Sequence, residues 1–178
     1  MNNILRNVLM RRSISQFDGR PVRDEDLMDI LEEGKVLSNA ANNQEWHFTI
    51  IQNRPLIRKL YSLRIDKSSP VSDAAEHLPF DAPVLMVISG RTDVKYAEDA
   101  ANMVFGSMML AADKYRVASC WLASAPQIFA TEEGQKVLNQ MSIPGGYTPL
   151  CVGAFGYKRA VVPANVFASE DNIVNIIK

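Results

Sequence analysis

Several residue types that mark specialised proteins are scarce in this 178-residue chain. It has only two cysteines, Cys120 and Cys151, and each stands in an apolar run. We therefore predict two buried, reduced thiols rather than a disulfide. The two histidines, His47 and His77, are far apart in the sequence. No cluster of histidine and cysteine ligands can be assembled from these residues, so no metal site is expected.

The chain also lacks an excess of charge and a long apolar segment. Its 19 lysines and arginines nearly balance 20 aspartates and glutamates, which argues against the basic surface typical of nucleic-acid binders. No apolar run is long enough to span a bilayer. Residues 1–13 do not combine a basic start with a continuous apolar core, so they do not resemble a secretory signal. We expect a cytoplasmic protein without nucleic-acid or membrane partners.

The pattern of apolar residues predicts a single α+β domain over residues 1–178. Helices are expected over 4–12, 24–37, 55–63, 96–115 and 131–140, with Asp24 and Thr131 as candidate N-terminal caps. Strands are expected over 46–52, 83–89, 118–123 and 148–157, and the continuous apolar run 83–89 suits a central strand. Residues 64–80 resemble a mobile loop, and the last twenty or so residues an extended arm.

One predicted helix has an unusual composition. Its segment Met103–Ala112 is apolar on every side, and such a helix must be buried all round. A central core helix in a monomer is one interpretation. We favour a second subunit that covers part of the helix, because exposed apolar patches of this length are uncommon on monomers. The small residues Gly106, Ser107 and Ala111 would allow another helix to approach closely.

Three segments are candidates for chemistry. Arg11, Arg12 and Ser13 place two guanidinium groups beside a hydroxyl, which suits a phosphate, although arginines at a helix C-terminus are often simply solvated. Residues 38–46 form an amide-rich turn before a strand, and amides match the donor and acceptor edge of a flavin pyrimidine ring. An ordinary helix-to-strand turn would use the same residues. The third segment runs from Asp99 to Leu122 and reads as core.

The order of these motifs resembles the nitroreductase family. Its members open with Arg-Arg-Ser-Ile-Arg-x-Phe and continue with a Pro-Ser-x-x-Asn-x-Gln-Pro-Trp turn that leads into a strand. The later elements of the series are also present in the chain: Ala82-Pro83 before a strand, Asn102-Met103 in the long helix, Cys120-Trp121, and a last strand ending in Gly156-Tyr157. The resemblance covers roughly residues 4–157, and the order of six motifs carries it rather than any single one.

The resemblance implies a central, mostly antiparallel sheet of about four to five strands, flanked by helices. It implies a homodimer with FMN in each of two interface sites. The implied activity is an oxidoreductase that uses NADH or NADPH as co-substrate. Hydride would pass through flavin N5 to a small electron-poor acceptor, such as a nitro compound or a quinone, in a ping-pong reaction. No catalytic side chain is expected, because the flavin carries the chemistry.

Individual positions follow from the same resemblance. Arg11 and Ser13, with Arg12 beside them, match residues near the FMN phosphate, and Lys158 and Arg159 stand where the family often has further phosphate-binding cations. The turn that contributes the flavin-facing amides comes from the partner subunit in the family. Its matching residues here are Asn42, at the ring, and Asn39 and Gln44 beside it. The backbone of Ala123–Ser124 matches the segment that passes the N5 edge.

The chain departs from the family pattern at several of these positions. Ser15 stands where the family usually has a basic residue near flavin N1 and O2, and loss of that cation should lower the reduction potential or shift the task to another group. Ala123-Ser124 replaces paired glycines, and Asn39 and Glu45 replace serine and proline. A non-catalytic flavin-binding or flavin-delivering protein therefore stays open. So does a different chemistry on the same fold, such as reductive dehalogenation or flavin breakdown, although segment 64–80 is a poor match for the lids of those relatives.

Overall fold

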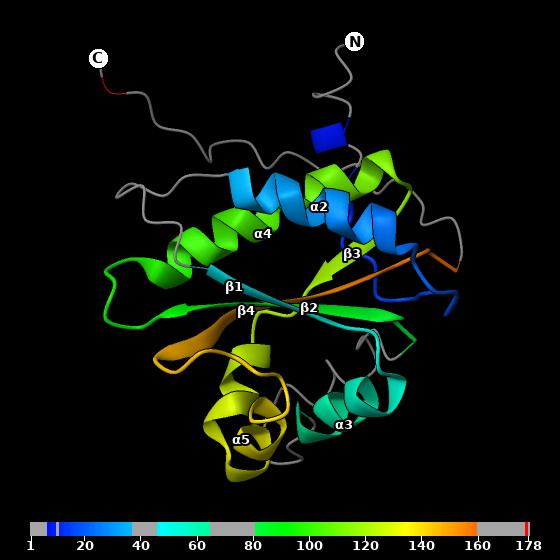
Figure 1. Cartoon of the computed structure of the whole chain (residues 1–178). Helices are drawn as coiled ribbons and strands as arrows, with labels where there is room; N and C mark the ends of the chain where they lie inside the picture. Colours follow the sequence, from blue (N-terminus) through cyan, green and yellow to red (C-terminus); the bar gives the residue numbers. More distant parts are fainter. Residues whose placement is uncertain (1–6, 10, 37–45, 65–80, 160–176, 178) are drawn as a thin grey trace.

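One antiparallel sheet organises the chain. The computed structural model describes residues 7–9, 11–36, 46–64, 81–159 and 177. Four strands lie in the order β1-β2-β4-β3, and each neighbouring pair is antiparallel. Their bounds are β1 Trp46–Ile51, β2 Val84–Arg91, β3 Ala118–Trp121 and β4 Tyr147–Gly156. The predicted class, an antiparallel sheet flanked by helices, is confirmed (Figure 1).

Helices cover both faces of the sheet (Figure 1). The helices α2 (Asp24–Val36) and α4 (Ala97–Lys114) lie on one face. The other face carries α3 (Arg54–Arg64), the 3-10 helix η2 (Ala125–Ala130) and α5 (Glu132–Leu138). Side chains of successive β2 residues point to opposite faces of the sheet. Met86 belongs to the apolar cluster under α2 and α4, and Leu85 belongs to the one under α3 and η2. Burial on both faces explains why β2 is a continuous apolar run.

The elements that fall within the described residues agree closely with the sequence predictions. Eight predicted segments begin and end within two residues of the observed bounds. Thr131 caps α5 as expected, since its hydroxyl accepts a hydrogen bond from the Gly134 N–H at 3.0 Å. The helix η2 was not predicted. Of the expected first helix, residues 7–9 are helical. Residues 65–80, which nearly cover the expected loop, and most of the expected C-terminal arm lie outside the described residues.

Both cysteines are buried and unpaired, which confirms their prediction as reduced thiols. Burial raises the pKa of Cys151 to about 12, so this thiol stays protonated at neutral pH. Within the described ranges, no helix combines the length and the apolar character needed to cross a bilayer.

The long helix α4 is buried on only one side within a single chain. Phe105 and Met108 face the sheet and α2 and are almost fully buried, whereas Met103 is 64% exposed and Leu110 37% exposed. Met103, Gly106 and Leu110 follow one another at helical spacing, and a side chain at Gly106 would meet nothing within 4 Å. We call these three residues the outward face of α4. The expectation that the helix is enclosed all round is therefore not met by one chain alone.

An ion pair between an exposed arginine and a buried carboxylate lies at the start of α2. Asp26 is 3% exposed and accepts two hydrogen bonds from Arg23, from Nε at 3.0 Å and from a terminal nitrogen at 2.7 Å. These bonds lower the pKa of Asp26 below its ordinary value. The carboxylate therefore stays charged at neutral pH, where it also interacts favourably with the N-terminus of its helix.

Helix α4 approaches the sheet at a glycine. A Cβ atom added to Gly153 of β4 would lie 1.9 Å from Cζ of Phe105. The ring of Phe105 also packs edge-to-face on Phe155, with centroids 5.6 Å apart. Since both rings are almost fully buried, neither can move aside without disturbing the core. Gly153 therefore sets the distance between α4 and the sheet.

We expect Gly153→Ala to destabilise the protein by about 1–3 kcal/mol or more, because overpacking a closed core forces side chains and backbone to shift. The measurement is chemical denaturation followed by circular dichroism. Gly145→Ala is the matched control, since a Cβ there meets nothing within 4 Å. Phe105→Leu in the Gly153→Ala background should restore part of the loss. Equal stabilities of the two alanine variants would contradict this account of the contact.

Candidate functional site

The segment that follows the first helical turn is attached to the edge strand β3. The N–H of Ile14 donates to the carbonyl of Ser119 at 3.0 Å, and Ser13 forms a parallel bridge with Ser119. The hydroxyl of Ser13 lies 3.4 Å from Sγ of Cys120 as a weak hydrogen bond. Ser13 as a residue remains exposed. These backbone hydrogen bonds hold Ser13 at the edge of the sheet, where the residue remains accessible to solvent.

The two arginines before Ser13 have different surroundings. Arg11 is half-buried, and one of its terminal nitrogens lies 4.0 Å from Sδ of Met109, on the flank of α4. Arg12 donates from one nitrogen to the carbonyls of Leu9 and Arg11, each at 2.8 Å. The side chain of Arg11 therefore reaches the flank of α4. The side chain of Arg12 instead donates hydrogen bonds to carbonyls at the end of the helical turn.

The segment after β3 is held at both of its ends. The N–H of Leu122 donates to the carbonyl of Val152 at 2.9 Å, and the N–H of Ala125 donates back to the carbonyl of Leu122 at 2.9 Å. Ala123 between them is exposed, and Ser124 is partly buried. The backbone of Ala123–Ser124 is therefore presented as a fixed turn at the end of β3.

The predicted cations after β4 lie beside the same N-terminal segment. Phe17 forms an antiparallel bridge with Lys158, and the N–H of Arg159 donates to the carbonyl of Gln16 at 3.1 Å. Lys158 is exposed. The guanidinium of Arg159 is paired with Asp81. Ser15, one residue before Gln16, is partly buried.

One residue of this region was misread from the sequence. Residues 119–122 read as core, yet Trp121 is 48% exposed, between Cys120 at 8% and Leu122 at 3%. The strand alternation of Cys120, Trp121 and Leu122 was the available signal, because neighbouring residues of a strand face opposite sides. The Trp121 side chain also hydrogen-bonds Cys151, an effect that opposes the rise in the pKa of that thiol caused by burial.

The structure gathers part of the predicted site and leaves part of it undescribed. Segment 11–18, the end of β3 and residues 157–159 meet along one edge of the sheet. This edge offers cations, a hydroxyl and an exposed aromatic ring, a combination that suits a planar aromatic ligand with an anionic tail. Asn39, Asn42 and Gln44 lie outside the described residues, so their position relative to this edge stays a prediction.

An antiparallel four-stranded sheet lies between two helical layers, and a segment with two arginines and a serine is attached to its edge strand β3. These features place the described residues in the α+β class. The model of the nitroreductase family matches residues 8–157, and the chain belongs to that family.

Individual relatives agree with this assignment. A protein of Archaeoglobus fulgidus, provisionally named NADH dehydrogenase/NAD(P)H nitroreductase, is 26% identical over 164 residues, which cover 89% of this chain and 87% of the relative. Two solved nitroreductases with bound FMN share the fold over 100% of both chains. One comes from Bacteroides fragilis (TM-score 0.84, 21% identity) and the other from Desulfitobacterium hafniense (TM-score 0.86, 19% identity).

Proposed function

We propose that this protein is an FMN-dependent oxidoreductase that takes hydride from NADH or NADPH and passes it to a small electron-poor acceptor, such as a nitro compound or a quinone. The observation that carries the proposal is the fixed edge formed by Arg11, Ser13 and the end of β3, in a chain of the nitroreductase family. The FMN named in two structures of the same fold supports the choice of cofactor.

The described residues fit an FMN molecule chemically. Arg11 and Lys158 supply cations and Ser13 a hydroxyl, which is a suitable donor set for a terminal phosphate. In the proposed site, Arg12 and Arg159 are neighbouring cations, although their guanidinium groups already contact protein oxygens. Ala123–Ser124 would present backbone along the reactive edge of the ring. Asn39, Asn42 and Gln44 would supply the amides at its pyrimidine end.

The chemistry proposed for the bound flavin is the acceptance and donation of hydride at N5, in a ping-pong cycle in which the oxidised nicotinamide leaves before the acceptor enters. The residues of this chain would hold and orient the flavin and tune its reduction potential. Arg11, positioned against α4, would fix the phosphate end, and the turn at Ala123–Ser124 would fix the reacting edge. In the proposed site, Ser15 would stand near N1 and O2 without supplying a cation, so we expect a lower flavin reduction potential than a basic residue there would give. The need for NAD(P)H supports a cytoplasmic location.

The test is turnover by the purified protein. We expect a bound chromophore that absorbs at about 450 nm, as oxidised flavins do, and oxidation of NADH or NADPH that depends on an added quinone or nitro compound. Initial rates at several concentrations of both substrates should give parallel double-reciprocal lines. Bound flavin without any turnover would instead favour a flavin-binding or flavin-delivering protein.

We expect Arg11→Ala to weaken FMN binding by about 1.5–3 kcal/mol, the usual scale for a hydrogen bond to a charged group. Titration of the apoprotein with FMN, followed by flavin fluorescence, measures the change. Arg91→Ala is a matched control, because Arg91 is an exposed arginine paired with Asp93 at the other end of the sheet. FAD should bind less tightly than FMN to the wild type, since the chain lacks a Gly-x-Gly-x-x-Gly turn for a dinucleotide. Equal affinities of the two arginine variants would refute this placement of the phosphate.

We also propose that the protein is a homodimer that uses the outward face of α4. Met103 and Leu110 are exposed there, and Val8 and Leu9, just before Arg11, are 52% and 54% exposed. Because Arg11 contacts Met109 of α4, these two apolar surfaces lie near each other. Large apolar side chains exposed near one another are typical of an interface.

Leu110→Glu should shift the protein from dimer to monomer, because it places a charge in the proposed interface. Sedimentation velocity at low micromolar concentration measures the change, and Met28→Glu, at a 47% exposed position of α2, is the matched control. FMN should dissociate from the monomeric variant more readily, because the flavin site would lose the partner's amide-rich turn. A wild-type protein that sediments as a stable, FMN-loaded monomer would overturn the proposal.

A further inference from the structure

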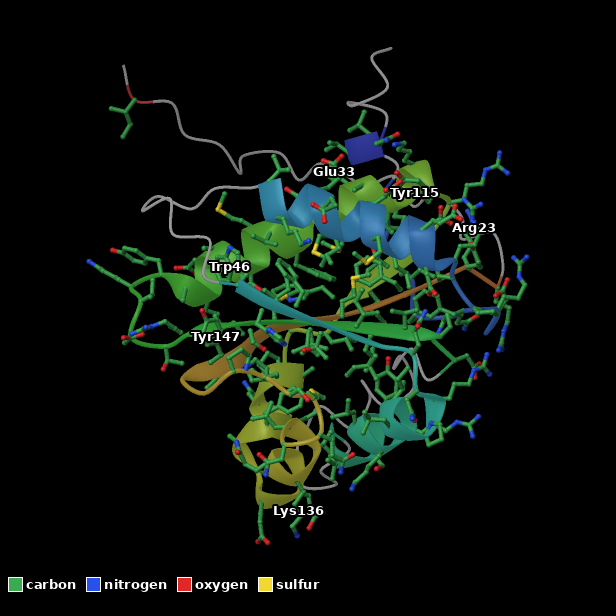
Figure 2. The ribbon with its side chains drawn as sticks, viewed as in Figure 1. Arg23, Glu33, Trp46, Tyr115, Lys136 and Tyr147 are labelled. Carbon is green, nitrogen blue, oxygen red and sulfur yellow. The ribbon has the colours of Figure 1, made fainter. Side chains whose placement is uncertain are left out.

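A second group of cations lies at the end of the sheet near Arg23, away from Trp46 and Tyr147 (Figure 2). It comprises Arg20, Arg54, Arg58 and Arg159, and we call it the arginine cluster. Arg20 stacks on the ring of Tyr157, with 4.9 Å from its guanidinium carbon to the ring centroid. The cluster draws on the chain before α2, the first two turns of α3 and the residues after β4.

The arginine cluster has too few carboxylates to balance it. Arg20 pairs with Asp18 at 2.7 Å, and Arg159 pairs with Asp81. Arg54 donates to the backbone carbonyl of Gly19, an uncharged acceptor. Among the residues that the structure describes, Arg58 has no ion pair. Within the described part of the chain, four guanidinium groups therefore face two carboxylates, which leaves two positive charges.

A hollow lies within this cluster. It is lined by Arg54, Ile57, Arg58, Asp81 and Ala82. Ile57 and Ala82 are buried and form a rigid apolar floor, whereas Arg54 and Arg58 are exposed. The two arginines are four residues apart on α3, so they stand on one face of that helix. Their guanidinium groups offer planar forks of donors to a ligand in the hollow.

We propose that this hollow binds a phosphomonoester dianion, and that the group is the 2′-phosphate of NADPH. The inference rests on the proposed function for the identity of the co-substrate. A phosphomonoester carries a charge close to −2 at neutral pH, which matches the two arginines that have no carboxylate partner among the described residues. Asp81 stays paired with Arg159 and so does not oppose the ligand with a free charge. NADH lacks the phosphate, so the site selects NADPH.

The hollow is distinct from the segment proposed for the FMN phosphate. Arg11 lies against Met109, on the α4 side of the sheet. Ile57, at the floor of the hollow, belongs to the apolar cluster on the α3 side. Arg159 is common to both groups of cations, but its guanidinium is paired with Asp81. Arg11 for the FMN phosphate and Arg58 for the hollow are therefore the residues that test the two sites separately.

The experiment is a calorimetric titration of the protein, saturated with FMN, with adenosine 2′,5′-bisphosphate, and with inorganic phosphate in a parallel arm. Arg58→Gln should weaken binding of the bisphosphate about two- to fivefold, the range for an exposed charge pair. Lys59→Gln is the matched control: Lys59 is the next residue of α3, but it lies toward Glu133 of α5. In turnover assays, the KM for NADPH should rise by the same factor in Arg58→Gln, with kcat and the KM for NADH unchanged.

Three results would overturn the proposal. Equal weakening in both variants would mean that net surface charge alone attracts the nucleotide. A parallel loss of FMN affinity in Arg58→Gln would mean that the arginine cluster holds the FMN phosphate. Inorganic phosphate that binds as tightly as the bisphosphate would make free phosphate the occupant. Binding of the bisphosphate that depends on Arg58, in a protein without NAD(P)H turnover, would reject the proposed function and leave the phosphate site standing.

Discussion

The contact of Phe105 with Gly153 sets the geometry on which the candidate site depends. It holds α4 at a fixed height over β4, and the flank of α4 is where Arg11 meets Met109. Trp121 is the direct partner of Gly153 across the β3–β4 pair. The positions of Trp121, at the end of β3, and of Arg11, beside α4, therefore both depend on the contact between Phe105 and Gly153. A shift of the helix would change the space between them.

The short strand β3 performs a second structural task, because it collects segments that are distant in the sequence. Its residue Ser119 binds the N-terminal segment at Ile14, and the turn at Leu122 is bonded to Val152 of β4. The N-terminal segment in turn pairs with the residues after β4 at Lys158. Backbone hydrogen bonds make all of these connections, so substitutions of side chains can alter the chemistry of the edge without changing its course.

Much of the fold could be predicted from the sequence, since β2 is continuously apolar and the helices have clear periodicity. Local patterns could not reveal η2, because a short 3-10 helix depends on its packing below the sheet. Composition also overestimated the burial of α4. Met103 and Met108 are chemically identical, and only the three-dimensional packing distinguishes their 64% and 0% exposure.

The candidate site was less predictable than the fold. The motif at Arg11 and Ser13 drew attention to this segment, but the sequence could not separate Arg11, which lies against Met109 of α4, from Arg12, which donates to backbone carbonyls. Similarly, the sequence does not distinguish Lys158 from Arg159, because both are cations that follow the last strand. The pairing of Arg159 with Asp81 depends on a residue 78 positions away, and no local pattern contains that information.

The strand β1 has a consequence for how the protein behaves in concentrated solution. Among the described residues it pairs only with β2, so one row of its backbone groups has no strand beside it. Its sequence, Trp-His-Phe-Thr-Ile-Ile, contains none of the lysines, prolines or acidic residues with which natural sheet edges resist further pairing. An edge of this composition is a template for any extended apolar segment. Resistance to aggregation therefore depends on keeping this edge covered, a demand separate from the stability of the core beneath it.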